Sequence, residues 1–261
     1  MTTTQRPNIF PALRYKDAHA AIDWLIRVFG FEKQGLFEAP DGSVAHAELS
    51  FGAGGISINS AGPADPKNPW SAVRQGLYIV VTDPDASHAR AKDAGAEIVQ
   101  PLRDLDYGSR EFSARDLDGH LWGFGTYDMT KTPGEPTIVS DVRYRNGRAA
   151  MTWLEKAFGF RKTFEVPGPD GPLVHGEMKL GDGAIYVEET PADPKHAALW
   201  GDDTHAFQVH LADPDAHHAR AKAGGATIVS EPASTAWARS YCARDPEGFL
   251  WGFTTYRPAQ G

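Results

Sequence analysis

The sequence contains a single cysteine, Cys242, so no disulfide bond can form within the chain. One thiol also excludes metal centres built on several thiolates, and it is typical of proteins in a reducing compartment. No run of about 18 apolar residues occurs, and the first residues, MTTTQRPN, lack the basic and then apolar pattern of a secretory signal. We therefore expect a cytoplasmic protein without a membrane partner.

The sequence also has fewer basic residues than acidic ones, with 26 Lys and Arg against 34 Asp and Glu. The formal net charge is −8, and both halves of the chain are mildly acidic. A protein that binds the phosphate backbone of DNA or RNA needs a basic face, so we expect no nucleic-acid partner. The sequence also lacks a nucleophile elbow, a phosphate-binding glycine loop and a dinucleotide fingerprint. These absences leave a small molecule as the expected partner.

The sequence does contain a long internal repeat. The string PADPK occurs at residues 63–67 and again at 191–195, and LWGF occurs at 121–124 and again at 250–253. Several further shared segments have the same offset of 128 to 130 residues. Agreement over so many separate segments indicates a duplication, so the chain holds two copies of one unit.

The duplication predicts the domain organisation. We expect one domain over residues 7–128 and a second over 137–257. Residues 129–136 fall between them and contain two prolines and a glycine, a composition typical of a linker. A chain built in this way resembles a dimer of single domains, so we expect a monomer or a weak homodimer.

Each copy divides into two smaller units with the same order of elements. In the first unit of copy one, residues 9–15 are predicted as a strand. Asp17 can then cap a helix from Ala18 to about Val28, and Gly30 can end it. Three more strands are predicted in this unit, near 33–38, 44–51 and 55–59.

The second unit of each copy repeats this order. An apolar strand at 77–81 precedes a helix with Asp83 as its cap and Pro84 as its first residue, and Gly95 can end that helix. The remaining strands of this unit are predicted near 97–101, 111–115 and 120–126. The pattern βαβββ therefore occurs four times along the chain, which predicts an α+β fold.

The order βαβββ, paired within about 120 residues, and the motif that closes each pair together resemble a known family. The closing motif is DLDGHLWG at 116–123 and DPEGFLWG at 245–252. With these features the chain resembles the vicinal oxygen chelate superfamily, which includes glyoxalase I, ring-cleaving dioxygenases and bleomycin- and fosfomycin-resistance proteins. The resemblance implies tandem glyoxalase-like domains whose sheets curl into a cleft, with the ligand on the concave face and the helices on the convex face.

The resemblance also implies where a divalent metal would bind. Metal-dependent members place His, Glu or Gln at four positions per domain, on the first and last strands of each module. Of these positions only Asn59 and Glu188 carry donor atoms; His205 lies one residue away from such a position, and that shift turns a strand side chain to the other face. The mapped positions are Phe10, Asn59, Gly76 or Leu77, and Gly123 in copy one, and Val139, Glu188, Ala206 and Gly252 in copy two.

We therefore expect neither a metal nor another cofactor, with a divalent metal held by Glu188 and His205 as the alternative. The sequence leaves open whether the modules pair within each copy or across the two copies. Pairing across the copies would separate Glu188 from His205.

Strand periodicity extends the prediction to side chains that line the cleft. The resemblance to glyoxalase I implies that Arg14 and Arg143 hold an acidic group of the ligand, although a salt bridge within the protein is an alternative. His210 is either a general base or a buried histidine with hydrogen-bond partners. The predicted ligand-binding residues are Phe10, Arg14, Asn59, Tyr78, Tyr107, Gly123, Arg143, Tyr186, Gln208, Trp237 and Gly252, and the candidate catalytic residues are His210 and Glu188.

Other repeated side chains have structural alternatives. His46 and Glu48 share one face of a strand, as do His175 and Glu177, so each pair is an acid–base pair or part of a cross-strand hydrogen-bond network. Tyr107 is expected either at the rim of the cleft or at the seam between the copies. Trp237 occupies the corresponding loop of copy two, Trp122 and Trp251 are expected in the core, and Gly123 and Gly252 are expected to leave space for a ligand.

Three functions follow from these observations. The first is metal-free binding of a small, largely apolar or aromatic molecule, as in the resistance proteins of the superfamily. The second is an enzyme, either metal-dependent through Glu188 and His205 or metal-free through His210 or the His175–Glu177 pair. The third is a structural or interaction module, which is supported only by the missing metal ligands.

Overall fold

A computed structural model describes residues 9–62, 75–127, 138–168, 171–189 and 205–257. The predicted linker at 129–136 lies outside these ranges. None of the helices in the described part of the chain is both long and apolar enough to cross a membrane.

Copy one contains two βαβββ modules, as predicted. Its elements are β1 (Ile9–Tyr15), α1 (Ala18–Phe29), β2 (Glu32–Glu38), β3 (Val44–Phe51), β4 (Gly54–Ser60), β5 (Gly76–Val80), α2 (Pro84–Asp93), β6 (Glu97–Asp104), β7 (Arg110–Arg115) and β8 (Leu121–Gly125). Asp17 and Asp83 cap the two helices by accepting hydrogen bonds from the amides of Ala20 and Ala86. Gly30 ends α1 with φ of 83°, a left-handed conformation that favours glycine.

Copy two repeats this order. Its elements are β9 (Ile138–Tyr144), α3 (Gly147–Phe158), β10 (Arg161–Pro167), β11 (Leu173–Leu180), β12 (Gly183–Glu189), β13 (Ala206–His210), α5 (Pro214–Ala223), β14 (Thr227–Ser234), β15 (Arg239–Arg244) and β16 (Leu250–Thr254). Asn146 and Asp213 take the cap positions of its two helices.

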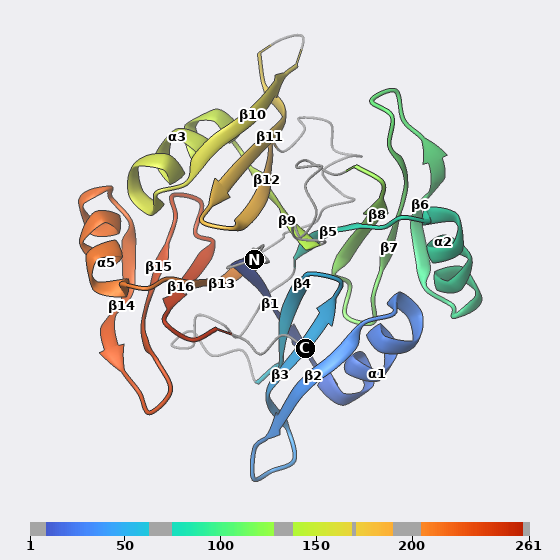
Figure 1. The fold of residues 1–261 in the computed structure, drawn as a ribbon, viewed down its shortest axis with the longest axis horizontal. Helices are drawn as coiled ribbons and strands as arrows, with labels where there is room; N and C mark the ends of the chain where they lie inside the picture. The colour runs from blue at the N-terminus through green and yellow to red at the C-terminus, as the bar shows by residue number, and fades with distance from the viewer. Residues whose placement is uncertain (1–8, 63–74, 128–137, 169–170, 190–204, 258–261) are drawn as a thin grey trace, which may run out of the picture.

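The strands form two eight-stranded sheets, and each sheet combines modules of both copies. Sheet one has the order β14-β15-β16-β13-β1-β4-β3-β2, and sheet two has the order β10-β11-β12-β9-β5-β8-β7-β6. At the centre of sheet one, β1 pairs antiparallel with β13, so that Phe10 lies opposite Gln208. At the centre of sheet two, β5 pairs antiparallel with β9, and Tyr78 lies opposite Val139. The modules therefore pair across the copies, and the four helices of the described residues, α1, α2, α3 and α5, lie at the periphery (Figure 1).

Each copy supplies nearly all of one hydrophobic core on the helix-covered side, and the other copy adds Ile138 to the first core and Ile9 to the second. In copy one, Leu25 and Phe29 of α1 pack with Trp122 and Phe124 of β8. In copy two, Phe158 of α3 packs in the same way against Trp251 and Phe253. Both tryptophans are fully buried, which confirms the prediction that they belong to the core.

The aspartate of the closing motif holds this core together. The Asp116 carboxylate accepts hydrogen bonds from the Tyr15 hydroxyl at 2.5 Å and from the Trp122 indole at 2.9 Å. Asp245 repeats this arrangement with Tyr144 and Trp251. The motif is therefore a structural feature of the fold, because its carboxylate faces the core.

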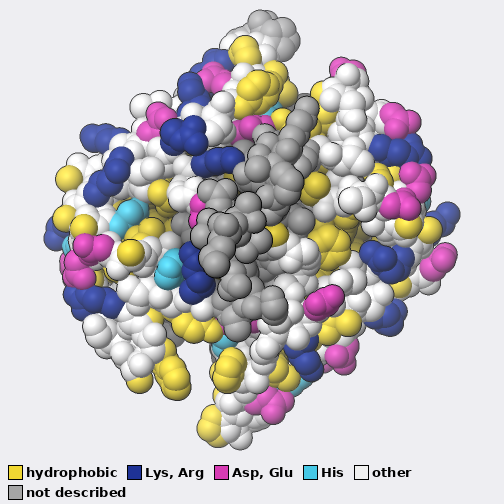
Figure 2. Space-filling model, in the orientation of Figure 1, with side chains coloured by type: hydrophobic (Ala, Val, Ile, Leu, Met, Phe, Trp, Pro, Cys, Tyr) yellow, Lys and Arg dark blue, Asp and Glu magenta, His cyan; other side chains and the backbone are white. Residues whose placement is uncertain are grey.

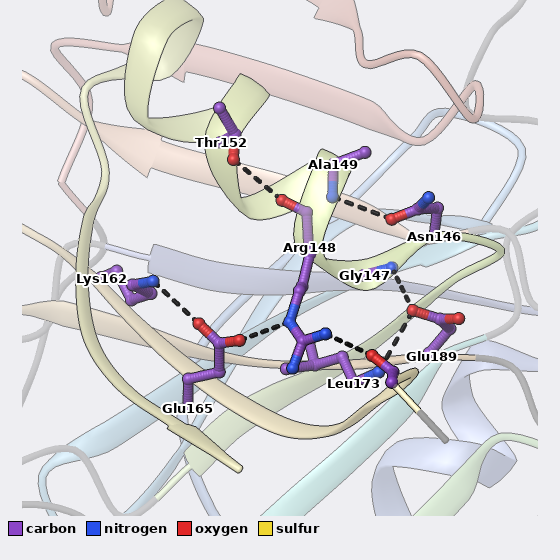
Figure 3. A network of polar contacts seen from close by, with 10 residues as sticks. Asn146, Gly147, Arg148, Ala149, Thr152, Lys162, Glu165, Leu173 and Glu189 are labelled. Atoms are coloured by element: carbon purple, nitrogen blue, oxygen red, sulfur yellow. Dashed lines mark hydrogen bonds and ion pairs between the residues drawn. The ribbon is translucent and has the colours of Figure 1, made fainter. Parts of the chain in front are cut away.

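The first helix of copy two is tied to its sheet by a polar network (Figure 3). A carboxylate oxygen of Glu189 accepts hydrogen bonds from the backbone amides of Gly147 at 3.0 Å and Leu173 at 3.3 Å. Arg148 donates to Glu165 at 2.5 Å. Glu189 thereby satisfies the Gly147 amide at the start of α3, which has no partner within the helix, and joins it to the first residue of β11.

Candidate functional site

The side chains of each sheet alternate between the helix-covered core and the opposite face, which we call the inner face. In β1, Leu13 and Tyr15 belong to the core cluster, so Phe10, Ala12 and Arg14 point to the inner face. Inner face one belongs to sheet one, and inner face two belongs to sheet two. Figure 2 shows the surface hollowed between the β2–β3 and β14–β15 hairpins, the two edges of sheet one.

Inner face one carries a row of polar side chains across three strands. The register places Arg14 opposite Asn59, and the Asn59 amide donates to the Ala45 carbonyl beside His46. Arg14 donates to the backbone carbonyl of Ser60 at 3.2 Å, and no carboxylate of the described residues lies within salt-bridge distance of it. Burial of the guanidinium lowers the pKa of Arg14, because desolvation disfavours the charged form.

The neighbouring row of inner face one contains a buried carboxylate. Glu48 is 3% exposed and lies opposite Ser57, which in turn lies opposite Ala12. The carboxylate accepts hydrogen bonds from His46 at 3.1 Å and from the Tyr256 hydroxyl. Because Tyr256 follows the last strand of copy two, this bond links the two copies across the face. Burial, with Glu48 beside the hydroxyl, raises the pKa of Tyr256 to about 12.

Inner face two repeats the link between the copies. The Tyr127 hydroxyl donates to Glu177 at 2.6 Å, and His175 lies 3.5 Å from the same carboxylate. Burial alone would lower the pKa of His175, but its contacts with Glu177 and Glu188 outweigh burial and raise the pKa to about 9. His175 is therefore protonated at neutral pH, which makes it a poor general base.

The arginine of inner face two has carboxylate partners that its counterpart lacks. Arg143 forms an ion pair with Glu188 and lies 3.5 Å from Asp141. The two equivalent positions on inner face one are neutral, because Asn59 replaces Glu188 and Ala12 replaces Asp141. The salt-bridge alternative thus applies to Arg143 but not to Arg14.

Tyrosine rings occupy the middle of inner face two. Tyr186 contacts the rings of Tyr78 at 5.7 Å, His175 at 4.9 Å and Tyr127 at 6.1 Å, measured between ring centroids. The Tyr78 ring also covers Gly123, where an added Cβ would lie 3.1 Å from a ring carbon. The prediction that Gly123 leaves space for a ligand is therefore wrong, because Tyr78 takes that space.

The metal positions can now be assigned to each face. Pairing across the copies brings Phe10, Asn59, Ala206 and Gly252 together on sheet one. Sheet two combines Val139, Glu188, Gly76 and Gly123. Among the residues that the structure describes, no three His, Cys, Asp or Glu side chains are placed to hold a metal ion. The mapped positions do not fit a divalent metal, since they offer one donor side chain on each face, Asn59 on sheet one and Glu188 on sheet two.

The structure also keeps Glu188 and His205 on different sheets. Glu188 lies on β12 of sheet two and forms an ion pair with Arg143 of β9. His205 precedes β13 of sheet one and is only 1% exposed. The His205 ring stacks on Phe207 at 5.8 Å and meets Phe249 edge to face at 5.0 Å. Burial and the nearby charge of Arg143 lower its pKa to about 3. The alternative that these two residues share a metal is not supported.

The remaining predicted residues lie at or near the faces. His210 is half-buried on inner face one, where its Nδ1 lies 3.2 Å from the Tyr256 carbonyl, and burial lowers its pKa. Trp237 is 85% exposed beyond the end of β14. Tyr107 is exposed, and its hydroxyl donates to Glu111 on inner face two at 3.1 Å. Phe10 is 1% exposed and packs beside Gly55.

Tyr127 and Tyr256 were not among the predicted residues. Both follow a threonine directly after the last strand of their copy, at an offset of 129 residues, so the repeat already contained the signal. Only the structure shows that each tyrosine reaches a carboxylate of the other copy.

Comparisons with known proteins agree with this architecture. The family model described as Glyoxalase/Bleomycin resistance protein/Dioxygenase superfamily matches residues 9–124 and again 138–253. An uncharacterised protein of Mycobacterium bovis is 30% identical over 131 residues, which are 48% of this chain and 86% of that protein.

Solved structures of the same architecture cover nearly the whole chain. Glyoxalase I from Zea mays has a TM-score of 0.75 at 16% identity, over 96% of this chain and 92% of that chain. A putative dioxygenase from Bacillus subtilis has a TM-score of 0.66 at 11% identity, over 98% of this chain and 86% of that chain. At these identities the likeness shows the fold alone.

Proposed function

The chain belongs to the Glyoxalase/Bleomycin resistance protein/Dioxygenase superfamily, and within it we propose that this protein binds a small, largely apolar or aromatic molecule on inner face one without a metal. One observation carries the proposal. The four positions that hold metal ligands in metal-dependent relatives are Phe10, Asn59, Ala206 and Gly252 on this face, while polar side chains that can recognise an organic ligand surround them.

The chemistry of inner face one supports a binding role. Arg14, Asn59, Gln208 and His210 carry hydrogen-bonding groups, and the rings of Phe37 and Tyr256, which flank His46, offer apolar contact. Small molecules are commonly held by such a mixture of a few placed polar groups and a mainly apolar lining. The hollow between the β2–β3 and β14–β15 hairpins lies at this face (Figure 2).

A metal-free enzyme is a second candidate because of one arrangement on the same face. Glu48 is buried between His46 and Tyr256 and lies one strand away from Ser57. A carboxylate held in this way can move a proton to or from a ligand that displaces the tyrosine hydroxyl.

A thermal-shift screen tests both candidates. Flat aromatic natural products and antibiotics are added to protein treated with a chelator, and the melting temperature is compared with and without Zn(II), Ni(II), Mn(II) and Fe(II). The proposal predicts compounds that raise the melting temperature equally under both conditions. Stabilisation that requires a metal would contradict it. Turnover of a stabilising compound that is lost in Glu48→Gln would favour the enzyme.

A further inference from the structure

The two inner faces derive from one duplicated unit, so each position on one face has a counterpart on the other. His46, Glu48 and Tyr256 on inner face one match His175, Glu177 and Tyr127 on inner face two, and on each face the tyrosine hydroxyl bonds to the glutamate that lies beside the histidine. Against this common frame, the side chains at the centre differ strongly. The comparison between the faces therefore shows which groups inner face one lacks.

The first missing group is an aromatic ring. Inner face two carries Tyr186 opposite Glu177, and the ring of Tyr186 is surrounded by His175, Tyr127 and Tyr78. At the equivalent position inner face one carries Ser57 opposite Glu48. The histidine and tyrosine that frame the ring are both retained there, with 6.1 Å between the centroids of His46 and Tyr256.

The hydroxyl of Ser57 supports the same conclusion. Ser57 is completely buried, and its Oγ has no hydrogen-bond partner among the described residues. A buried hydroxyl without a partner is unfavourable, and a ligand that brings a polar atom to it would satisfy it. Ser57 has the same position on inner face one as Tyr186 has on inner face two, so its hydroxyl lies where the Tyr186 side chain starts on that face.

The second missing group is a carboxylate. Arg143 on inner face two is neutralised by Glu188 and Asp141, and those positions are Asn59 and Ala12 on inner face one. Among the described residues, the half-buried guanidinium of Arg14 therefore has the Ser60 carbonyl as its hydrogen-bond partner. A planar guanidinium binds a carboxylate through two parallel hydrogen bonds, so Arg14 favours an anionic ligand group.

We infer that the ligand of inner face one is an aromatic acid, whose ring takes the place of the Tyr186 side chain and whose carboxylate takes the place of Glu188 and Asp141. This inference rests on the proposed function, because it names the ligand class of the same face. On inner face two, Tyr186, Glu188 and Asp141 of the protein itself occupy these places, so this face has a structural role and binds no such ligand. The chain binds one such ligand, at Arg14 and Ser57.

Titration calorimetry with paired probes tests the inference. The probes are benzoate, 4-hydroxybenzoate and indole-3-acetate, each compared with its neutral carboxamide, and cyclohexanecarboxylate as an acid without an aromatic ring. We expect one aromatic acid per chain, at least about tenfold tighter than the amide, the effect of losing one charge-assisted hydrogen bond. Equal binding of acid and amide, a stoichiometry of two, or binding of cyclohexanecarboxylate as tight as that of benzoate would overturn the inference.

Variants with matched controls locate the site. Arg14→Gln should weaken binding of the acid by about tenfold or more and leave the amide unchanged, whereas Arg143→Gln should change neither. Ser57→Tyr should abolish binding by supplying the ring, and Tyr186→Phe is its control on the other face. A circular dichroism melt of each variant separates loss of binding from loss of folding, and Arg14→Gln decides the question if Ser57→Tyr does not fold.

The outcomes separate this inference from the proposed function. If neutral aromatic molecules bind inner face one and no aromatic acid does, the ligand class is wrong and the binding function stands. If neither class binds and no compound of the thermal-shift screen stabilises the protein, both fail. Loss of acid binding in Arg143→Gln but not in Arg14→Gln would place the ligand on inner face two and overturn the assignment.

Discussion

His205 offers a sharp test of the structural account, because the duplication supplies its comparison. Gln75 occupies the same place in copy one: the Leu121 amide donates to the Gln75 carbonyl at 3.0 Å, and the Leu250 amide donates to the His205 carbonyl at 3.0 Å. The side-chain amide of Gln75 donates to the backbone carbonyls of Ala12 and Ala206. The two ring nitrogens of His205 are buried and have no hydrogen-bond partner in the part of the chain that the structure describes.

We predict that His205→Gln stabilises the protein. The glutamine can reach the carbonyls that correspond to the partners of Gln75, and it removes a buried ring whose nitrogens are unsatisfied. The expected gain at pH 7 is about 1–3 kcal/mol in the free energy of unfolding. The reciprocal change, Gln75→His, should lower the free energy of unfolding by a similar amount.

The same substitution should change the acid sensitivity. The folded-state pKa of His205 is about 3, below the value of about 6.5 in an unfolded chain, so between these values the unfolded chain binds one more proton. The free energy of unfolding therefore falls as pH is lowered, by up to about 1.4 kcal/mol per pH unit, or about 2 kcal/mol from pH 6.5 to 5. This contribution is absent in His205→Gln.

Urea unfolding followed by circular dichroism at pH 7, 6 and 5 measures both effects. The difference between the wild type and His205→Gln should grow as pH falls, because the other titrating groups are common to both. A variant that is less stable at pH 7, or that has the same pH dependence as the wild type, would refute the description of His205 as a buried, unpartnered and neutral ring.

Three further changes test other contacts by their effect on the melting temperature and the free energy of unfolding. Tyr256→Phe removes a hydrogen bond to the buried carboxylate of Glu48 and should cost about 1–3 kcal/mol; an unchanged stability would show that this bond does not link the copies. Gly125→Ala places a methyl group against the Tyr78 hydroxyl and should cost about 1–3 kcal/mol, and a neutral result would mean that Tyr78 does not fill inner face two. Arg148→Ala breaks an ion pair at a partly exposed side chain and should cost less than about 1 kcal/mol (Figure 3); a larger loss would assign the network at the start of α3 a central role in stability.

Most of the fold could be predicted from the sequence because its signals are local or repeated. Asp17, Gly30 and Asp83 mark helix ends by their backbone chemistry, and the structure places those ends where the sequence does. The predicted strand at 97–101 is three residues longer, since Pro101 lies in the edge strand β6 and needs no donor there.

The pairing of modules across the copies could not be predicted. Each module offers the same edge strand to either partner, so the pattern of β1 fits β5 and β13 equally well in the sequence. The structure selects β13 for β1 and β9 for β5, and this choice decides which side chains share a face.

Only part of the candidate site could be predicted, because the sequence does not show which strands lie side by side. Strand periodicity assigned Arg14 and Arg143 to inner faces, but both have the same sequence position in their copies. Their difference comes from residues on the neighbouring strand, Asn59 and Glu188, whose register only the structure supplies. The space above Gly123 was mispredicted because the side chain that fills it, Tyr78, also lies on an adjacent strand.

Binding of an organic molecule on inner face one, without help from a metal, is the function that we propose. Titration calorimetry of the full chain with benzoate, 4-hydroxybenzoate and indole-3-acetate, before and after exhaustive treatment with a chelator, tests it most directly when metal content is measured on the same samples. The account predicts one binding event per chain with the same affinity in both samples, and with less than one metal per ten chains after chelation. Binding that disappears with the metal and returns with about one equivalent of Zn(II) or Ni(II) would contradict it.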